Sequence, residues 1–336
     1  MLNLISKIPY FQILYLIKEI YFIFIKIYDI IYIENKKEYK YTLLRRNFMN
    51  NLEIKNNALN RVKEHYMYLL ANYPERSILG VFLYGSQNYN LATENSDVDT
   101  KAIYIPTFEE IALNKTPISK ELHIKGEHCE LKDIRLMWQM WKKQNMNFVE
   151  CLFTNCVKLN PNYESLYFST IFPHRDEIAR YDEKAAILST VYQTEHTICQ
   201  IKMEEPDKIG KKLANGYRLV NFCESFYIDC YNDFNSNYGY TMELTGILRQ
   251  QLLSLKNNTN LSEEEVNNHK QNILTRCETI KRFLDNDEFF KSKIEKNKAK
   301  QAKLDAIMGE EISKIIFTRN EFDVKKYIME GFVDVS

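Results

Sequence analysis

Two aspartates separated by one residue, Asp97 and Asp99, have the spacing in this sequence that most directly indicates chemistry. Side chains two positions apart on a strand project the same way, so these carboxylates can face one ligand together. Two carboxylates at that separation repel each other, and a hard cation such as Mg²⁺ or Mn²⁺ relieves the repulsion. The spacing therefore predicts a metal site at Asp97 and Asp99.

A glycine-serine pair, Gly85 and Ser86, lies a short distance before the aspartates. Glycine lets a backbone approach a ligand closely, and the amides that open a helical turn attract phosphate oxygens. We therefore predict that Gly85 and Ser86 bind phosphate next to the metal.

Two strands are expected to position these residues. The apolar run Leu79–Tyr84 stops at Gly85 and predicts a buried strand that ends in a tight turn. A second strand is predicted from Val98 to Ile105, because two sets of residues alternate there: Val98, Thr100, Ala102 and Tyr104 against Asp99, Lys101, Ile103 and Ile105. Ahead of both, a helix is predicted from apolar residues at helical spacing: Leu59, Val62, Tyr66, Leu69 and Leu70. His65 lies off this stripe and is expected in solvent.

Gly85-Ser86 followed by Ser96-Asp97-Val98-Asp99 resembles the two-part signature of the DNA polymerase β-type nucleotidyltransferase superfamily. The run from Gly85 to Leu91 resembles the phage-encoded and RNA-repair-associated branch of that superfamily. The resemblance implies transfer of a nucleoside monophosphate from an NTP to a hydroxyl, with Ser86 at the triphosphate and Asp97 and Asp99 at Mg²⁺. Where that branch has a second glycine this chain has Asn90, and asparagine tolerates the left-handed conformation that such a turn requires.

The resemblance also implies a third carboxylate on a later strand, which completes the metal site and helps to activate the attacking hydroxyl. Our candidate is Glu130, in a predicted strand Cys129–Lys132. Asp133 is the reserve, because it is better explained as the N-cap of a helix with the apolar stripe Ile134, Met137, Trp138 and Trp141. His128 would share the face of Glu130, but Mg²⁺ prefers oxygen ligands, so we expect it to be a bystander.

Two further segments are interpreted structurally. A helix is expected to start near Pro106–Glu110, and the stretch that follows, as far as Lys125, is expected to be a loop. The run Asn145–Glu150 resembles an Asn-x-Asn-x-x-Glu pattern of the same branch. We interpret Asn145 as a helix C-cap and Asn147 as the N-cap of a new helix.

The second half of the sequence is predicted to be helical from Asp182 onward. Lys211, Asn215 and Arg218 fall on one helical face. That segment resembles a lysine-rich helix of related transferases, in which cations reach the triphosphate, so Lys211 and Arg218 are candidate phosphate-binding residues. A solvated helix face is the alternative.

Ser262 and Glu265 form a predicted capping box. The tract Lys291–Lys303 is interpreted as a solvated helix or a polynucleotide contact.

Composition limits the class of protein. The chain has 336 residues, with 45 Lys plus Arg and 45 Asp plus Glu, so no net basic field indicates a nucleic-acid partner. Its seven cysteines lack metal-site spacing and predict reduced thiols and a cytoplasmic location. No uninterrupted apolar run approaches the about 18 residues of a transmembrane span.

Residues 1–48 differ from the rest in being dense in Ile, Tyr, Phe and Leu. The codons for Arg45 and Arg46 can form a purine-rich ribosome-binding sequence ahead of Met49, so we expect this leader to be translated upstream sequence. An amphipathic helix at a membrane surface is the alternative.

The sequence therefore predicts an α/β fold: a small mixed-sheet nucleotidyltransferase domain at 49–160, then an all-helical domain at 161–336 that walls the nucleotide cleft. The partners are an NTP and an acceptor that is an RNA end, a protein side chain or a small molecule. Two alternatives remain open. One is a glycosyltransferase that uses Asp97 and Asp99, and the other is a catalytically silent, antitoxin-like or binding module on the same fold.

Overall fold

In a computed structural model, the chain divides into two units, Met1–Glu53 and Ile54–Ser336. The structure describes residues 56–93, 96–228, 238–286 and 288–331. The expected leader, residues 1–48, and the expected start at Met49 therefore lie outside the described residues.

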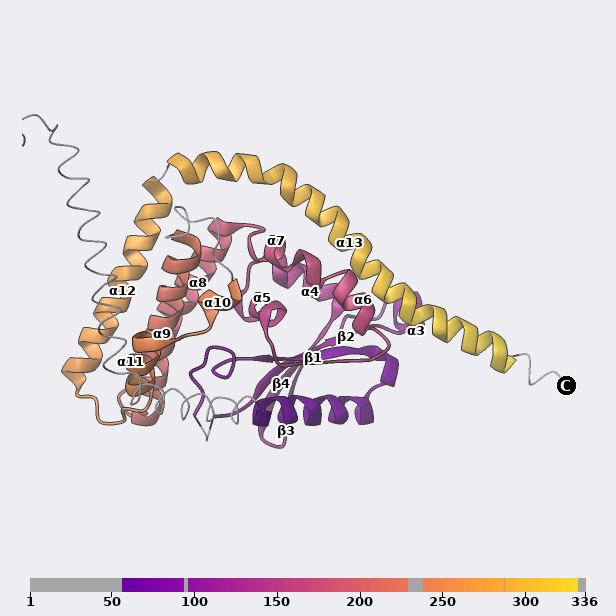
Figure 1. The fold of residues 1–336 in the computed structure, drawn as a ribbon, viewed down its shortest axis with the longest axis horizontal. Helices are drawn as coiled ribbons and strands as arrows, with labels where there is room; N and C mark the ends of the chain where they lie inside the picture. The colour runs from indigo at the N-terminus through magenta and orange to yellow at the C-terminus, as the bar shows by residue number, and fades with distance from the viewer. Residues whose placement is uncertain (1–55, 94–95, 229–237, 287, 332–336) are drawn as a thin grey trace, which may run out of the picture. The chain divides into compact units, whose positions relative to one another are not determined.

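A five-stranded mixed sheet carries the predicted site (Figure 1). Its strand order is β3-β4-β2-β1-β5, and β2 pairs with β4 in parallel while the other neighbours are antiparallel. The strands are β1 Ile78–Tyr84, β2 Asp99–Tyr104, β3 Ser119–Ile124, β4 Glu127–Asp133 and β5 Val157–Leu159. The predicted α/β class and both predicted strands of the site, β1 and β2, are confirmed.

One face of the sheet is covered by the helix over residues 56–72, which lies beside the strands in Figure 1. Val62, Tyr66 and Leu69 of that helix are buried against strand residues that include Val81 and Leu131. The predicted apolar stripe is therefore confirmed at Val62, Tyr66, Leu69 and Leu70, whereas Leu59 is only partly buried and lies outside this cluster. The expectation that His65 is solvated is wrong, because its side chain is fully buried among polar partners from the sheet.

The opposite face is covered by α4 Ile134–Lys142 and α5 Met146–Val149. Asp133 caps α4, since its carboxylate accepts a hydrogen bond from the Arg135 amide, and the four predicted apolar residues of α4 are buried. The interpretation of Asn145 is wrong: it is the N-cap of α5, and its side chain accepts from the Asn147 amide. α4 already ends at Lys142 with Lys143 as its C-cap, and Gln144 follows at φ +52°.

The stretch expected to be a loop before Lys125 contains a strand, β3, at the edge of the sheet. Its side chains are mostly exposed, so it has no apolar alternation from which a strand could be predicted. The short helix ahead of it, α3 Phe108–Ala112, starts where it is predicted, with Thr107 and Glu110 forming a capping box.

The second half of the described chain is helical, as predicted. Its longer helices are α8 Glu183–Cys199, α9 Pro206–Cys223, α11 Gly246–Lys256, α12 Glu263–Asn286 and α13 Glu288–Gly331. Shorter helices are α6 Glu164–Ser169, α7 Arg175–Ala179 and α10 Tyr238–Met242, and single turns lie at Glu75–Ser77, Glu150–Phe153, Phe172–His174 and Glu224–Ile228. The Ser262–Glu265 capping box is confirmed.

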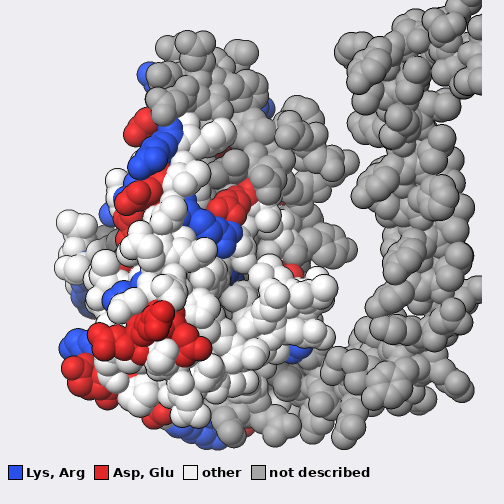
Figure 2. Space-filling model, turned by 90° about the vertical axis from the view of Figure 1, so that its left-hand side faces the viewer, with Lys and Arg blue, Asp and Glu red and all other residues white. Residues whose placement is uncertain are grey.

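The face of the sheet that α4 and α5 cover shares one hydrophobic core with the helical half, and this core extends from Leu79 in β1 to Ile315 in α13. Among the described residues, no helix is both long and apolar enough to cross a membrane. Figure 2 shows acidic and basic side chains interspersed on one face, with no broad basic surface among the described residues drawn there. The mixture of charges on that face is consistent with the equal numbers of basic and acidic residues in the chain.

Candidate active site

Asp97 and Asp99 lie where the chain enters β2. Asp97 is exposed and Asp99 is half-buried, and neither carboxylate makes a hydrogen bond or ion pair with another described residue. Burial raises the pKa of Asp99, His128 opposes this shift, and the neighbouring Asp97 carboxylate adds to it. The two carboxylates are therefore close enough to repel each other and are open to a cationic ligand.

Gly85, at the end of β1, lies against the second aspartate. A Cβ atom placed on Gly85 would be 3.1 Å from Asp99 Oδ2, and Gly85 has φ +83°, in the left-handed region that favours glycine. The turn then runs to Leu91, whose amide donates to the Ser86 carbonyl at 3.0 Å. Asn90 has φ +62°, so the left-handed conformation expected for it is confirmed.

Glu150 supports this turn from inside the protein. Its fully buried carboxylate accepts a hydrogen bond from the Tyr89 hydroxyl at 2.6 Å and faces the Gly85 amide at 3.5 Å. Burial raises the pKa of Glu150, and the charge of Arg218 opposes that shift. The Asn-x-Asn-x-x-Glu run thus ends in a residue that stabilises the glycine-serine turn.

Arg218 belongs to the same buried group. Its guanidinium lies 3.5 Å from the centroid of the Tyr89 ring, and its Nε donates to Asn215 Oδ1 at 3.1 Å. Only 3% of Arg218 is exposed. Asn215 and Arg218 share a face of α9 as predicted, but the contacts of Arg218 are with the side chains that support the turn.

Two lysines of the helical half lie near the aspartates. Lys211 is exposed on α9, and its charge lowers the pKa of Asp99. Lys256, the last residue of α11, donates to the Leu91 carbonyl at 2.7 Å and to Ser96 Oγ at 3.3 Å. Burial lowers the pKa of Lys256, the charge of Lys211 lowers it further, and Asp97 opposes both.

Sequence reasoning missed Lys256 because the contact that identifies it joins residues 165 positions apart. In the sequence it stands at the edge of a polar linker and carries no local signal.

Glu130 is engaged by two lysines. Its carboxylate accepts one hydrogen bond from Lys101 and pairs with Lys132 at 2.9 Å. Burial acts to raise the pKa of Glu130, but the bonds and charges of Lys101 and Lys132 outweigh it, and the pKa is lowered. The register pairs Glu130 with Lys101, two residues along β2 from Asp99. The reserve residue, Asp133, is fully buried and bridges to Arg135 at 2.7 Å.

His128 is the β4 residue that the register brings beside Asp99. Thr100 of β2 pairs with Cys129 of β4 in the parallel ladder. The residues that precede them, Asp99 and His128, are therefore neighbours on the other face of the sheet. The Tyr84 hydroxyl lies 2.9 Å from His128 Nδ1. The strand register, which the sequence alone does not fix, therefore brings His128 beside Asp99 and Glu130 beside Lys101.

Among the described residues, no group of three or more His, Cys, Asp or Glu side chains is placed to hold a metal ion. Mg²⁺ is commonly bound by one or two carboxylates together with substrate phosphates and water. Asp97 and Asp99, which lack protein partners within the described chain, fit that mode of binding.

Comparison with known proteins gives no assignment: no protein-family model matches the chain, and no curated protein matches it.

Proposed function

We propose that this protein is a metal-dependent nucleotidyltransferase that moves a nucleoside monophosphate from an NTP to a hydroxyl group. The main support for the proposal is the position of Gly85, where an added Cβ would lie 3.1 Å from Asp99 Oδ2, so that a left-handed glycine turn lies beside a carboxylate pair without protein partners among the described residues. Lys211 and Lys256 add positive charge on the same side. This combination suits a triphosphate and its cation.

In the proposed reaction, the acceptor oxygen forms a bond to the α-phosphorus and the bond to the bridging oxygen breaks. Pyrophosphate leaves, and the hydroxyl proton passes to a base or to water. Asp97 and Asp99 would hold Mg²⁺ or Mn²⁺, which would neutralise charge on the phosphates. Gly85 and Ser86 would bind the β- and γ-phosphates, and Lys211 would neutralise the charge that develops on them.

Glu130 remains the candidate third carboxylate on the resemblance alone, and it would act only after release from Lys101 and Lys132. For Arg218 we propose a different role from the predicted one: it supports the turn through Tyr89 and Glu150.

A second candidate function is a catalytically silent binding module on the same fold. The neutralisation of Glu130 by two lysines favours it, because a third carboxylate is then missing from the metal site.

The test is to incubate the full-length protein with each α-³²P-labelled NTP, Mg²⁺ and a mixture of RNA, protein and small molecules. We expect label from at least one NTP to appear in an acceptor. Asp97→Asn and Asp99→Asn should each lower the rate at least about 100-fold, or roughly 2.7 kcal/mol of transition-state stabilisation.

Asp285→Asn, which removes an exposed acid of α12, is the control and should leave the rate unchanged. NTP binding without transfer of label from any donor would favour the binding module.

A further inference from the structure

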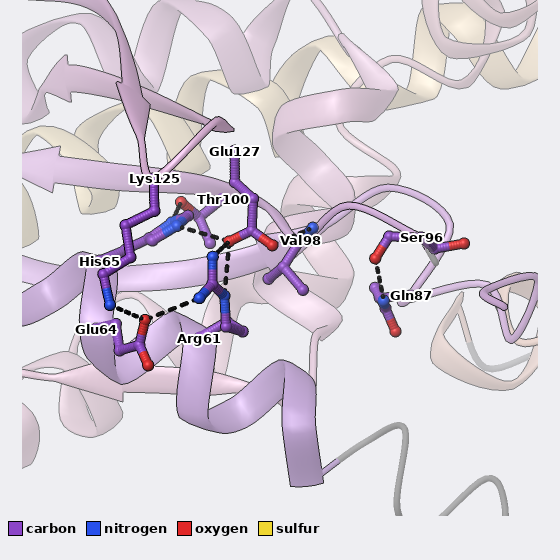
Figure 3. Close-up of polar contacts among 9 residues, drawn as sticks. All are labelled: Arg61, Glu64, His65, Gln87, Ser96, Val98, Thr100, Lys125 and Glu127. Atoms are coloured by element: carbon purple, nitrogen blue, oxygen red, sulfur yellow. Dashed lines mark hydrogen bonds and ion pairs between the residues drawn. The ribbon is translucent and has the colours of Figure 1, made fainter. Parts of the chain in front are cut away.

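A polar cluster lies on the face of the sheet that the helix over residues 56–72 covers (Figure 3). Arg61, Glu64 and His65 come from that helix, Thr100 comes from β2, and Glu127 begins β4. These five residues are linked by hydrogen bonds. The proposed reaction uses none of them.

His65 connects the helix to β2. Its Nδ1 lies 2.8 Å from Thr100 Oγ1 and its Nε2 lies 3.1 Å from Glu127 Oε2. A carboxylate only accepts, so Nε2 donates to Glu127, and in a neutral ring Nδ1 accepts from the Thr100 hydroxyl. Burial lowers the pKa of His65, and Glu127 opposes that shift.

Glu127 uses both of its oxygens. Oε2 accepts from Arg61 Nε at 2.9 Å and from Arg61 Nη2 at 2.7 Å, a paired arrangement that fixes the carboxylate. Oε1 accepts from the backbone amide of Val98 at 3.3 Å. Val98 is only 3% exposed, so this amide has little access to water as a partner.

The residues held by this cluster alternate with the aspartates along the chain: Asp97, Val98, Asp99, Thr100. β2 begins at Asp99, so the position of Asp97 depends on how Val98, which connects it to the strand, is fixed. The Val98 amide is bound by Glu127, and the Thr100 hydroxyl is bound by His65. Each aspartate therefore adjoins a residue that is held from behind the sheet.

We propose that Glu127 and His65 are positioning residues for the Asp97–Asp99 pair, acting through the Val98 amide and the Thr100 hydroxyl. The proposal rests on the proposed function to the extent that the pair holds a divalent cation. Groups that fix the ligands of a metal typically contribute a factor of about 10–100 in metal affinity or activity.

The experiment measures binding of Mn²⁺ alone to the full-length protein by electron paramagnetic resonance, at a temperature where circular dichroism shows every variant folded. Glu127→Ala should weaken Mn²⁺ binding about 10–100-fold. Glu64→Ala is the matched control, because Glu64 pairs with Arg61 of the cluster and with Lys125 but not with a residue of β2. It should bind Mn²⁺ like the wild type.

A second pair of variants separates positioning from the electrostatic effect of removing a carboxylate, and it replaces Glu127→Ala if that variant does not fold. Thr100→Val removes an uncharged hydroxyl at nearly constant volume and should weaken Mn²⁺ binding, whereas Thr100→Ser should restore it. Where transfer is measurable, raising the Mn²⁺ concentration should rescue the rate of Glu127→Ala but not of Asp99→Asn.

Wild-type Mn²⁺ affinity in Glu127→Ala and Thr100→Val would overturn the proposal, as would an equal loss in Glu64→Ala. If the wild type binds Mn²⁺ through its aspartates but transfers no nucleotide, the proposed function fails and the Mn²⁺ comparison still decides the positioning role. A wild type that neither transfers nucleotide nor binds Mn²⁺ would overturn both.

Discussion

The ionised carboxylate of Asp99 destabilises the folded protein, because it is half-buried, has no hydrogen-bond partner among the described residues and is poorly solvated. Its raised pKa expresses the same fact: the folded protein binds a proton at Asp99 more tightly than the unfolded chain does. Function and stability therefore conflict at this residue.

We predict that Asp99→Asn makes the metal-free protein more stable at pH 7 while it removes transfer activity. The folded-state pKa of Asp99 lies above its ordinary value of 3.8, so the destabilisation by the carboxylate is fully present above the raised pKa. The advantage of the asparagine variant should shrink as the pH falls through that raised pKa and disappear below 3.8.

Thermal melts in EDTA across this pH range provide the measurement, with the exposed Asp97→Asn as the comparison. An asparagine variant at position 99 that melts below the wild type at pH 7 would show that the carboxylate has a stabilising partner instead.

At the scale of the element, the site depends on the turn that joins β1 to the segment before β2. Gly85 permits two things at once, a left-handed backbone and contact with the Asp99 carboxylate. Gly126, between β3 and β4, has a similar φ of +85° but nothing within 4 Å of an added Cβ. A comparison of substitutions at Gly85 and Gly126 therefore separates the effect of backbone strain from the effect of crowding at Asp99.

Gly85→Ala and Gly126→Ala should each destabilise the fold by about 1–2 kcal/mol, the cost of a left-handed alanine. Only Gly85→Ala should also lower nucleotide transfer and Mn²⁺ binding, because its methyl group displaces Asp99. Denaturant unfolding together with the transfer assay measures both effects. Equal activity in the two variants would mean that the contact of Gly85 with Asp99 does not matter to the chemistry.

The elements that were predicted correctly are those with a strong local pattern. β1 and β2 have continuous or alternating apolar residues, and α4 has a buried stripe with its cap. β3 was missed because an edge strand with exposed side chains has no such pattern. The start of α5 was misplaced because α4 ends at Lys142 and Gln144 follows with a positive φ, which no residue preference of glutamine indicates.

The site was only partly predictable for a related reason. Gly85, Asp97 and Asp99 are close in sequence and were found as one motif. The burial of His65, the pairing of Glu130 with Lys101 and the approach of Lys256 all depend on contacts between distant segments. Such contacts are fixed by strand register and helix packing, which a single sequence does not specify.

At the scale of the whole molecule, two helices bring positive charge to the aspartates of a neutral protein. α9 and α11 cross closely at Gly210, where an added Cβ would be 2.3 Å from the Leu255 carbonyl oxygen. Lys211 and Lys256 stand next to these two residues. The close crossing thus determines how near the two lysines approach each other and Asp97.

We predict that Gly210→Ala destabilises the protein by about 1–3 kcal/mol, because the clash is with backbone and the helices must separate. It should also weaken NTP binding, since the two lysines move apart. Gly309→Ala in α13, where an added Cβ meets nothing within 4 Å, is the control and should stabilise by up to about 1 kcal/mol. Calorimetric titration with NTP compares the affinities of the two variants. Wild-type affinity in Gly210→Ala would show that the spacing of Lys211 and Lys256 does not contribute to NTP binding.

Nucleotidyl transfer at Asp97 and Asp99 can be measured by following two labels of one NTP in parallel. The full-length protein is supplied with α-³²P or γ-³²P nucleotide, Mg²⁺ and acceptor mixture, beside Asp99→Asn. We predict that the α-label enters the acceptor and the γ-label is released as pyrophosphate, both only with Asp99 intact. Transfer of the γ-label to the acceptor, its release as orthophosphate, or the same products from Asp99→Asn would contradict it.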